Sequence, residues 1–250
     1  MNEQAIFEAI KNARDSEATS LYLSELQMQA VPEEIGKLAN LVWLYLSENQ
    51  LTTLPDAIAN LRSLTWLHLE CNQFSAIPEA VMYLDNLTVL NLAENQIEEV
   101  PSEIKNLCNL ARLDISNNHL KKLPSEIGFL KFLRWLDLCE NNLEHLPLEI
   151  ARLTNLTELD LRKNHFTSLP KEIGNLTNLT DLYLGNNQLS YLPPEIGYLT
   201  NITELDLSYN QLTTLPPEIA YLTNLVRLDL RGNSIDAASL SNLRHDVILI

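Results

Sequence analysis

A frame of 23 residues repeats along almost the whole chain, and this repeat constrains the possible folds more than any other feature. Each copy reads, with small departures, L-x-x-L-x-L-x-x-N-x-L-x-x-L-P-x-x-I-x-x-L. The copies begin at Leu41, Leu64, Leu87, Leu110, Leu133, Leu156, Leu179, Ile202 and Leu225. Self-similarity at one fixed period indicates a solenoid, in which each coil contacts only its neighbours. We therefore expect the 250 residues to form one domain.

Each coil contains a short alternating segment followed by a helical signal. Around the second and third leucines, apolar and variable residues alternate, as in Trp43-Leu44-Tyr45-Leu46. This pattern predicts a strand whose leucines face the core and whose variable residues face one exposed side of a parallel sheet. After the turn, most coils read Leu-Pro-x-Glu-Ile. Proline and an early glutamate suit the start of a helical turn, so the outer side of each coil is predicted to be a short α-helical or 3-10 segment.

One asparagine stands at the same position of successive coils. The chain must turn sharply there, at a place where backbone groups cannot reach water. An asparagine side chain offers both a donor and an acceptor to the backbone of the neighbouring coil. We interpret the column as a structural ladder, and its members are Asn49, Asn72, Asn95, Asn118, Asn141, Asn164, Asn187, Asn210 and Asn233.

Both ends of the array depart from the frame. Residues 1–17 are predicted to form an N-terminal cap, with an amphipathic helix from Glu3 to Arg14 that covers the first coil. Residues 18–238 hold about ten coils, of which the first carries Leu26 where the ladder asparagine is expected. Residues 239–250 are predicted to form a C-terminal cap, in which residues 247–250 could add a closing strand.

Composition narrows the class of partner. The net charge of -16 disfavours nucleic acid and anionic membranes, and it favours neutral or basic proteins. No apolar run is long enough to span a membrane, and the N-terminus lacks the features of a secretory signal. The three cysteines, Cys71, Cys108 and Cys139, are scattered rather than clustered. This usage predicts a reducing, cytoplasmic location.

The sequence predicts neither catalysis nor a cofactor. It contains no phosphate-binding loop, zinc motif or nucleophile motif, and its histidines fall in different columns. The row formed by Asp114, Asp137 and Asp160 suggests a calcium site, because oxygen ligands suit this ion. A linear row leaves most of the coordination sphere to water, so we expect no metal there.

The variable residues of the strands form two regions on the exposed side of the sheet. The first half is aromatic and the second half is acidic, with Asp181, Glu204, Asp206 and Asp229 extending the acidic run. Exposed aromatic clusters mark protein contacts, and an acidic run can steer a basic partner. Two simpler interpretations stay open: aromatic stacking between strands, and solubility from the carboxylates. The predicted partner-binding residues are Tyr22, Trp43, Tyr45, Trp66, His68, Arg112, Asp114, Trp135, Asp137, Glu158 and Asp160.

The frame, with segments such as Asn210–Ile219, resembles the leucine-rich repeat (LRR) proteins of the 23-residue Ras-group and bacterial intracellular type. The resemblance implies a right-handed curved α/β solenoid with its sheet on the concave face. It also implies a non-enzymatic, monomeric module that binds a small GTPase, another signalling protein or a basic protein on that face. The alternatives are an acidic inhibitor that occludes a basic enzyme, the recognition arm of a larger Roco-type or signalling protein, and a structural repeat with no dedicated partner.

Overall fold

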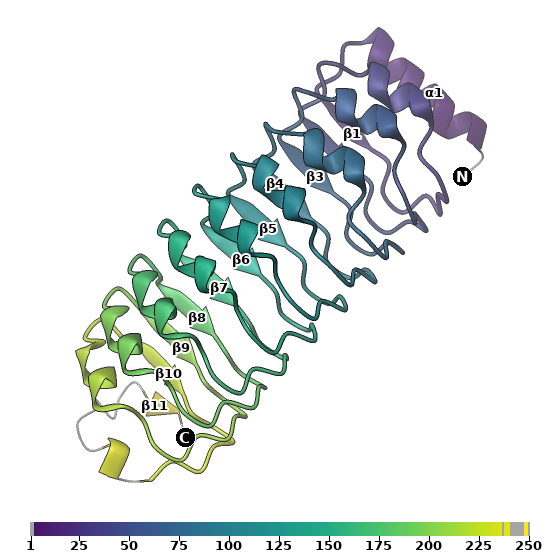
Figure 1. Ribbon diagram of the computed structural model, residues 1–250. Helices are drawn as coiled ribbons and strands as arrows, with labels where there is room; N and C mark the ends of the chain where they lie inside the picture. Colours follow the sequence, from purple (N-terminus) through teal and green to yellow (C-terminus); the bar gives the residue numbers. More distant parts are fainter. Residues whose placement is uncertain (1–2, 237, 241–247, 250) are drawn as a thin grey trace.

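One strand and one 3-10 segment form each coil in the computed structural model, which describes residues 3–236, 238–240 and 248–249 (Figure 1). The chain begins with helix α1 (Glu3–Asp15). The strands are β1 (Ser20–Tyr22), β2 (Trp43–Tyr45), β3 (Trp66–His68), β4 (Val89–Asn91), β5 (Arg112–Asp114), β6 (Trp135–Asp137), β7 (Glu158–Asp160), β8 (Asp181–Tyr183), β9 (Glu204–Asp206), β10 (Arg227–Asp229) and β11 (Ile248–Leu249). The 3-10 segments are η1 (Glu33–Lys37), η2 (Asp56–Asn60), η3 (Glu79–Tyr83), η4 (Ser102–Asn106), η5 (Ser125–Phe129), η6 (Leu148–Arg152), η7 (Lys171–Asn175), η8 (Pro194–Tyr198), η9 (Pro217–Tyr221) and η10 (Ala238–Leu240).

The strands form one open parallel sheet in which every strand pairs with its neighbours in chain order. The register equals the repeat length, so that Trp43 lies opposite Trp66 and Leu44 opposite Leu67. Each column of the sequence therefore becomes a row of neighbouring side chains across the sheet. The predicted leucine-rich solenoid is confirmed.

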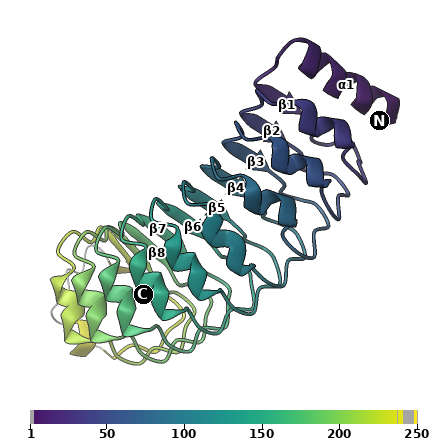
Figure 2. The ribbon, with the colours of Figure 1, turned by 45° about the horizontal axis from the view of Figure 1, so that its top comes forward.

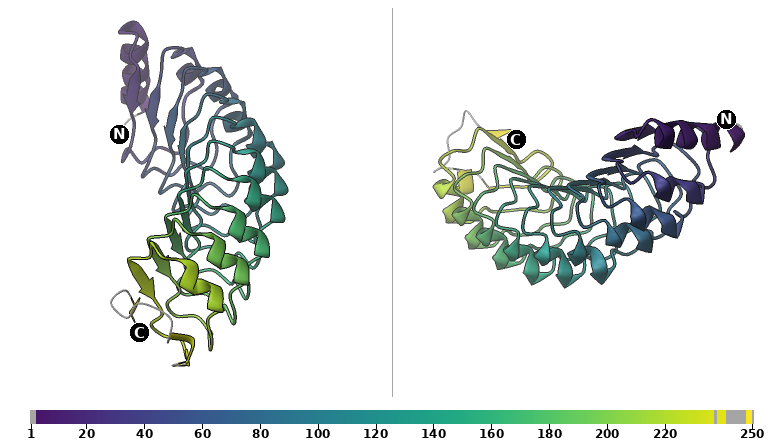
Figure 3. Two further views of the ribbon diagram at one scale, coloured as in Figure 1. Left: turned by 90° about the vertical axis from the view of Figure 1, so that its left-hand side faces the viewer. Right: turned by 90° about the horizontal axis from the view of Figure 1, so that it is seen from above.

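The stack of coils is curved, with the strands on the inner side and the 3-10 segments on the outer side (Figures 2 and 3). A helical turn is broader than a strand, so the outer side of the stack is longer than the inner side. A proline directly precedes most of the outer segments. Pro124, for example, precedes η5 and has an extended conformation. Helix α1 and strand β11 lie at opposite ends of the arc (Figure 1).

The core is a set of apolar columns that runs the length of the arc. The strand leucines, such as Leu44 and Leu46, and the 3-10 residues, such as Ile58, are fully buried. Phe74 and Phe166 fill a column that holds leucine, isoleucine or methionine in other coils, and both are also fully buried. The period-two and 3-10 patterns of the sequence thus specify the core directly.

The asparagine column joins adjacent coils beneath the strands. The Asn118 amide oxygen accepts a hydrogen bond from the Ile97 N–H at 2.9 Å, and its nitrogen donates to the Leu92 carbonyl at 3.0 Å. Both of these partners belong to the preceding coil, and the same pattern recurs from Asn49 to Asn233. The residue before each ladder asparagine has a positive φ, from Glu48 at 53° to Gly232 at 74°.

A second asparagine ladder lies on the flank where the chain passes from the 3-10 segments to the strands. Its members are Asn86, Asn109, Asn155, Asn178, Asn201 and Asn224, and each donates its amide to a carbonyl 24 residues earlier. This ladder was not predicted from the sequence. The recurring Asn-Leu pair at the end of each coil is the signal that could have revealed it.

The two ends of the solenoid are covered differently. Helix α1 buries Ile6, Ile10 and Ala13 against the first coil and leaves Phe7 exposed. At the other end, β11 pairs with β10 through Ile248 and Leu249. This agrees with the closing strand predicted at residues 247–250, of which 247 and 250 lie outside the described residues. Within the described part of the chain, no helix combines the length and apolar character needed to cross a lipid bilayer.

Candidate interaction surface on the concave face

The first three strands carry two aromatic rows on the concave face. In one row, Tyr22, Tyr45 and His68 stack with ring centroids 4.7 and 4.8 Å apart and interplanar angles of 9° and 16°. In the other row, Trp43 and Trp66 lie opposite each other in register and are 36% and 40% exposed. The stacking that the sequence left open as an alternative is therefore present in the tyrosine row. The two tryptophans remain accessible to a partner.

A hollow of about 170 Å³ opens between Trp66 on β3 and Trp135 on β6. Val89 and Leu90 of β4, the first of the two intervening strands, line it. The structure brings Trp66, His68, Arg112, Asp114 and Trp135 together around this hollow, all of them among the predicted binding residues. Tyr22, Trp43 and Tyr45 lie beyond one end of the hollow, and Asp137, Glu158 and Asp160 beyond the other.

Arg112 is held in place at the hollow by an aromatic ring. Its guanidinium carbon lies 4.5 Å from the ring centroid of Trp135, within the range of a cation–π contact. Among the described residues, no carboxylate forms an ion pair with Arg112 and its guanidinium donates no hydrogen bond. The hollow therefore offers unused, pre-positioned donors beside two apolar walls.

The aspartates of the acidic half have a local role that was not predicted from the sequence. In the column that follows the central strand leucine, the carboxylate accepts a hydrogen bond from the backbone N–H two residues later, as Asp137 does from Cys139 at 2.9 Å. Asp114, Asp160, Asp206 and Asp229 make the same contact. Arg162 and Arg231 bind the carboxylates of Asp160 and Asp229, which are only 3% and 2% exposed. These aspartates hold the ends of the strands, and they present less charge to a partner than their number suggests.

The pKa values of these aspartates differ with their surroundings. It raises the pKa of Asp137 to about 7, against the opposing effect of the Cys139 N–H and with help from the charges of Asp160 and Asp114. Burial also raises the pKa of Asp114. The hydrogen bonds from Arg231 lower the pKa of Asp229 instead. Half-buried carboxylates at the centre of the arc thus lose charge more readily than the paired one near its C-terminal end.

The remaining acidic residues of the described strands lie on β7, β8 and β9. Glu158, Asp181 and Glu204 are neighbours in register and partly exposed. The guanidinium of Arg227 donates to Glu204 at 2.7 Å. The acidic character that the sequence predicted for this half is concentrated in this row.

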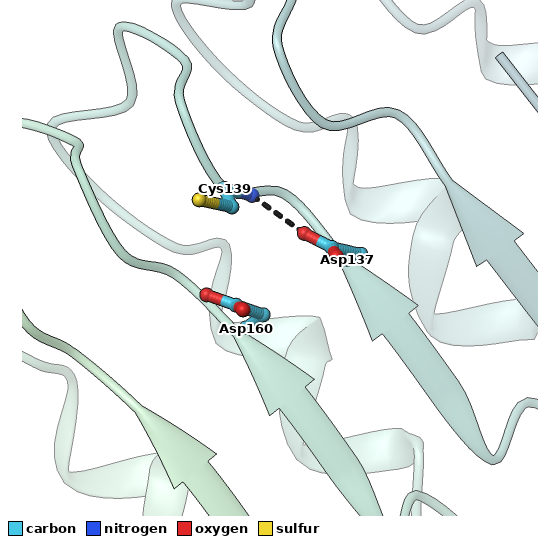
Figure 4. Close-up of side chains that lie close together, drawn as sticks. All are labelled: Asp137, Cys139 and Asp160. Atoms are coloured by element: carbon cyan, nitrogen blue, oxygen red, sulfur yellow. Dashed lines mark hydrogen bonds between the residues drawn. The ribbon is translucent and has the colours of Figure 1, made fainter. Parts of the chain in front are cut away.

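Asp137, Cys139 and Asp160 are close enough to suggest a metal site, because their potential ligand atoms lie within 4.8 Å of one another (Figure 4). However, burial raises the pKa of the Cys139 thiol to about 12, and a metal requires the thiolate. Both carboxylate oxygens of Asp160 already accept hydrogen bonds from Arg162. The two carboxylates are thus engaged separately at the strand ends, Asp137 by the Cys139 backbone N–H and Asp160 by Arg162.

Comparisons with known proteins agree with this architecture. A family profile described as "leucine-rich repeat region" matches residues 103–188, and one described as "leucine rich repeat" matches residues 16–74, 63–120 and 177–235. A search of curated proteins found no match.

Several solved structures resemble this chain. A TDR receptor is 31% identical, with a TM-score of 0.81 over 90% of this chain and 41% of that one. The plant peptide hormone receptor RGFR1, in complex with RGF2, is 30% identical, with a TM-score of 0.81 over 96% of this chain and 41% of that one. PEPR1, in a structure with AtPEP1, is 28% identical, with a TM-score of 0.65 over 87% of this chain and 39% of that one. This chain spans well under half of each receptor chain. The profile matches extend from residue 16 to residue 235, and the chain belongs to the leucine-rich repeat family.

Proposed function

We propose that this protein is a non-enzymatic module that binds an extended segment of a partner protein across its concave face. The hollow between Trp66 and Trp135 is the observation that carries this proposal. A cavity of about 150 Å³ accepts a benzene ring, so the hollow is large enough for one aromatic or branched side chain. Leucine-rich repeats generally serve in protein–protein interaction, and one of the similar receptors was solved in complex with RGF2.

The walls and rim of the hollow supply different parts of the binding energy. The two tryptophans offer rigid apolar area, of the kind that dominates interface energetics. Arg112 offers N–H donors to a backbone carbonyl or a carboxylate of the bound segment. Trp43, Tyr45 and Tyr22 would continue the contact along the aromatic end of the sheet.

A pull-down with matched variants tests the proposal. The double variant Trp66→Ala/Trp135→Ala removes both walls of the hollow. The double variant Tyr198→Ala/Tyr221→Ala removes two aromatic side chains that are at least as exposed but end the convex segments η8 and η9. Circular dichroism first establishes that all three proteins are folded. We expect wild type and the convex variant to capture the same partner and the concave variant to lose it. Equal capture by all three proteins would refute the proposal.

A second candidate function is inhibition of a basic enzyme by occlusion. The adjacent carboxylates of Glu158, Asp181 and Glu204 favour it, because an acidic row attracts a basic surface. Binding of that kind weakens steeply with added salt, whereas binding through the tryptophans depends little on salt. A salt titration of the captured complex therefore separates the two functions.

The proposal includes a cytoplasmic location and a monomeric state, with a small GTPase or another signalling protein as the partner class. The free thiols of Cys71, Cys108 and Cys139 support the location, because thiols persist in reducing compartments. Subcellular fractionation tests the location, and light scattering of the purified chain tests the monomeric state.

A further inference from the structure

The sequence column of the flank ladder holds a residue other than asparagine at two coils, and both positions border one groove. In the column of Asn86 and Asn109, position 63 holds a serine and position 132 a phenylalanine. The side chain of phenylalanine has no amide group to donate. The coil at Phe132 therefore lacks an equivalent of the hydrogen bond that Asn155, in the next coil, makes to the Lys131 carbonyl at 2.7 Å. A groove of about 800 Å³ runs between these two positions.

Folding does not account for Phe132. Its ring is 58% exposed, and the neighbouring Phe129 is 50% exposed, so the coil gains little apolar burial from either. Replacing a ladder asparagine by an exposed aromatic residue removes an inter-coil hydrogen bond and adds apolar surface to water. Clustered exposed apolar side chains of this kind mark contact surfaces.

The charge of the groove is opposite to that of the protein. Arg62 and Arg134 line it, and none of the described residues that line it is a carboxylate. The chain as a whole has 33 acidic residues against 17 basic ones. Among the described residues, Arg134 has no hydrogen-bond or ion-pair partner for its guanidinium, and Arg62 donates only to the Tyr83 carbonyl at 2.5 Å.

Unused acceptors lie between the two arginines. Asn86 and Asn109 line the floor of the groove and donate to the carbonyls of Arg62 and Asp85. Among the described residues, nothing donates a hydrogen bond to their amide oxygens. A backbone that crosses the coils there would find acceptors for its N–H groups.

We propose that this flank groove, defined by Arg62, Ser63, Asn86, Asn109, Phe132 and Arg134, binds a short acidic segment of a partner protein in an extended conformation. The groove crosses four consecutive junctions between coils, from Arg62 to Arg134. At about 4.8 Å per coil this is roughly 14 Å, the length of about four to five extended residues. The bound segment carries a carboxylate near each end, one for each arginine, and an apolar side chain that packs on Phe132. This surface is separate from the concave hollow, and the inference does not depend on the proposed function.

Selection from a random heptapeptide library displayed on phage tests the inference while the partner is still unidentified. The library is selected on the intact chain and counter-selected on the variant Phe132→Asn, which restores the ladder residue. The variant should melt no lower than wild type, so that loss of binding cannot come from loss of fold. Enriched peptides are then measured by fluorescence anisotropy against wild type, Arg62→Gln/Arg134→Gln, the convex-side control Arg152→Gln, and Trp66→Ala/Trp135→Ala.

The inference predicts peptides with two acidic residues three or four positions apart and an aromatic or aliphatic residue beside one of them. Their affinity should fall at least tenfold in Phe132→Asn and in Arg62→Gln/Arg134→Gln, and should be unchanged in Arg152→Gln and in the tryptophan variant. Enrichment of basic peptides, or of peptides that bind Phe132→Asn as well as wild type, would overturn the inference. Loss of binding only in the tryptophan variant would also overturn it and would assign the peptides to the concave face.

Discussion

At the residue scale, one buried asparagine per coil satisfies backbone groups of two coils at once. Asn118→Ala removes the acceptor for the Ile97 N–H and the donor for the Leu92 carbonyl, both of which are buried. We expect a loss of about 1–3 kcal/mol in the free energy of unfolding, the cost of leaving such groups unsatisfied. Urea unfolding followed by circular dichroism measures it.

The exposed flank ladder supplies the matched control. Asn155→Ala removes one hydrogen bond at a site that water can reach, so its cost should stay below about 1 kcal/mol. Equal losses in Asn118→Ala and Asn155→Ala would contradict the view that the inner ladder matters because it is buried.

Cys71 and Cys108 allow a test of whether a side chain is costly at the positions with positive φ. Cys71 has a φ of 56°, a conformation that glycine adopts without steric cost, whereas Cys108 is absent from the residues with positive φ. We expect Cys71→Gly to raise the melting temperature, corresponding to a gain of up to about 1 kcal/mol, and Cys108→Gly to leave it unchanged or lower it. Differential scanning calorimetry of both variants decides the question, and a lower melting temperature for Cys71→Gly would show that its side-chain packing outweighs backbone strain.

The sequence predicts which residues face outward but not what their side chains do there. The period-two pattern correctly orients Asp137 and Asp160 toward the concave face. That each accepts the N–H two residues later depends on how the strand ends, which the pattern does not encode. The same limit applies to Arg162, which could be predicted to relieve the acidic run but not to bind Asp160 from two residues away.

At the element scale, the strand ends give stability an unusual pH dependence. Asp137 has a pKa of about 7 in the folded chain and an ordinary value near 3.8 when unfolded, so between these values the folded state binds the extra proton. Its contribution therefore favours folding at low pH and is lost as the pH rises through about 7. Asp137→Asn should exceed wild type in stability at pH 8 by at least about 1 kcal/mol, and the gap should close toward pH 4.

Asp229 should behave in the opposite sense, because Arg231 lowers its pKa. Its contribution is present at neutral pH and is lost as the pH falls through the lowered value. Asp229→Asn should therefore melt below wild type at pH 7, and this difference should shrink in acid. Melting curves of both variants from about pH 2 to pH 8 give the two trends, because the change at Asp229 lies below its ordinary pKa of 3.8. Parallel trends would contradict the assignment.

The capping helix can be tested by two substitutions one turn apart. Ile10 is buried against the first coil, and Phe7 on the same helix is exposed. Ile10→Asp places a charge in the core and should lower the melting temperature by several degrees and promote self-association through the uncovered coil. Phe7→Asp should do neither. Light scattering after mild heating compares the two variants, and identical behaviour would show that the helix is dispensable as a cap.

Element boundaries could be predicted more closely than element type. The helix expected from Glu3 to Arg14 ends one residue later, at Asp15. The sequence does not decide between α-helix and 3-10 helix for the outer segments, because five residues beginning after a proline satisfy the signals of both. The structure adopts the 3-10 form, as in η5 (Ser125–Phe129), which closes with the Leu130 N–H bonded to the Ile127 carbonyl.

At the scale of the whole molecule, the repeat predicts the architecture because every coil has the same pattern of apolar, asparagine and proline positions. The hollow between Trp66 and Trp135 is a different kind of feature. It arises because two coils lie between those of the two tryptophans and because Val89, which lines the hollow, is small enough to leave space between them. Its residues could be predicted individually, but its volume depends on how side chains from four coils pack together.

Each coil forms its contacts almost entirely with the coil on either side of it, and this determines how the array should respond to a pulling force. Under tension applied to its two ends, the chain should unwind coil by coil, because only the ladder bonds of the outermost coil bear the load at any moment. Each step should release 23 residues, roughly 75 Å of extended chain. Optical-tweezers traces should show this as a series of equal extensions at similar force, so that the protein yields gradually where a single globular core would rupture at once.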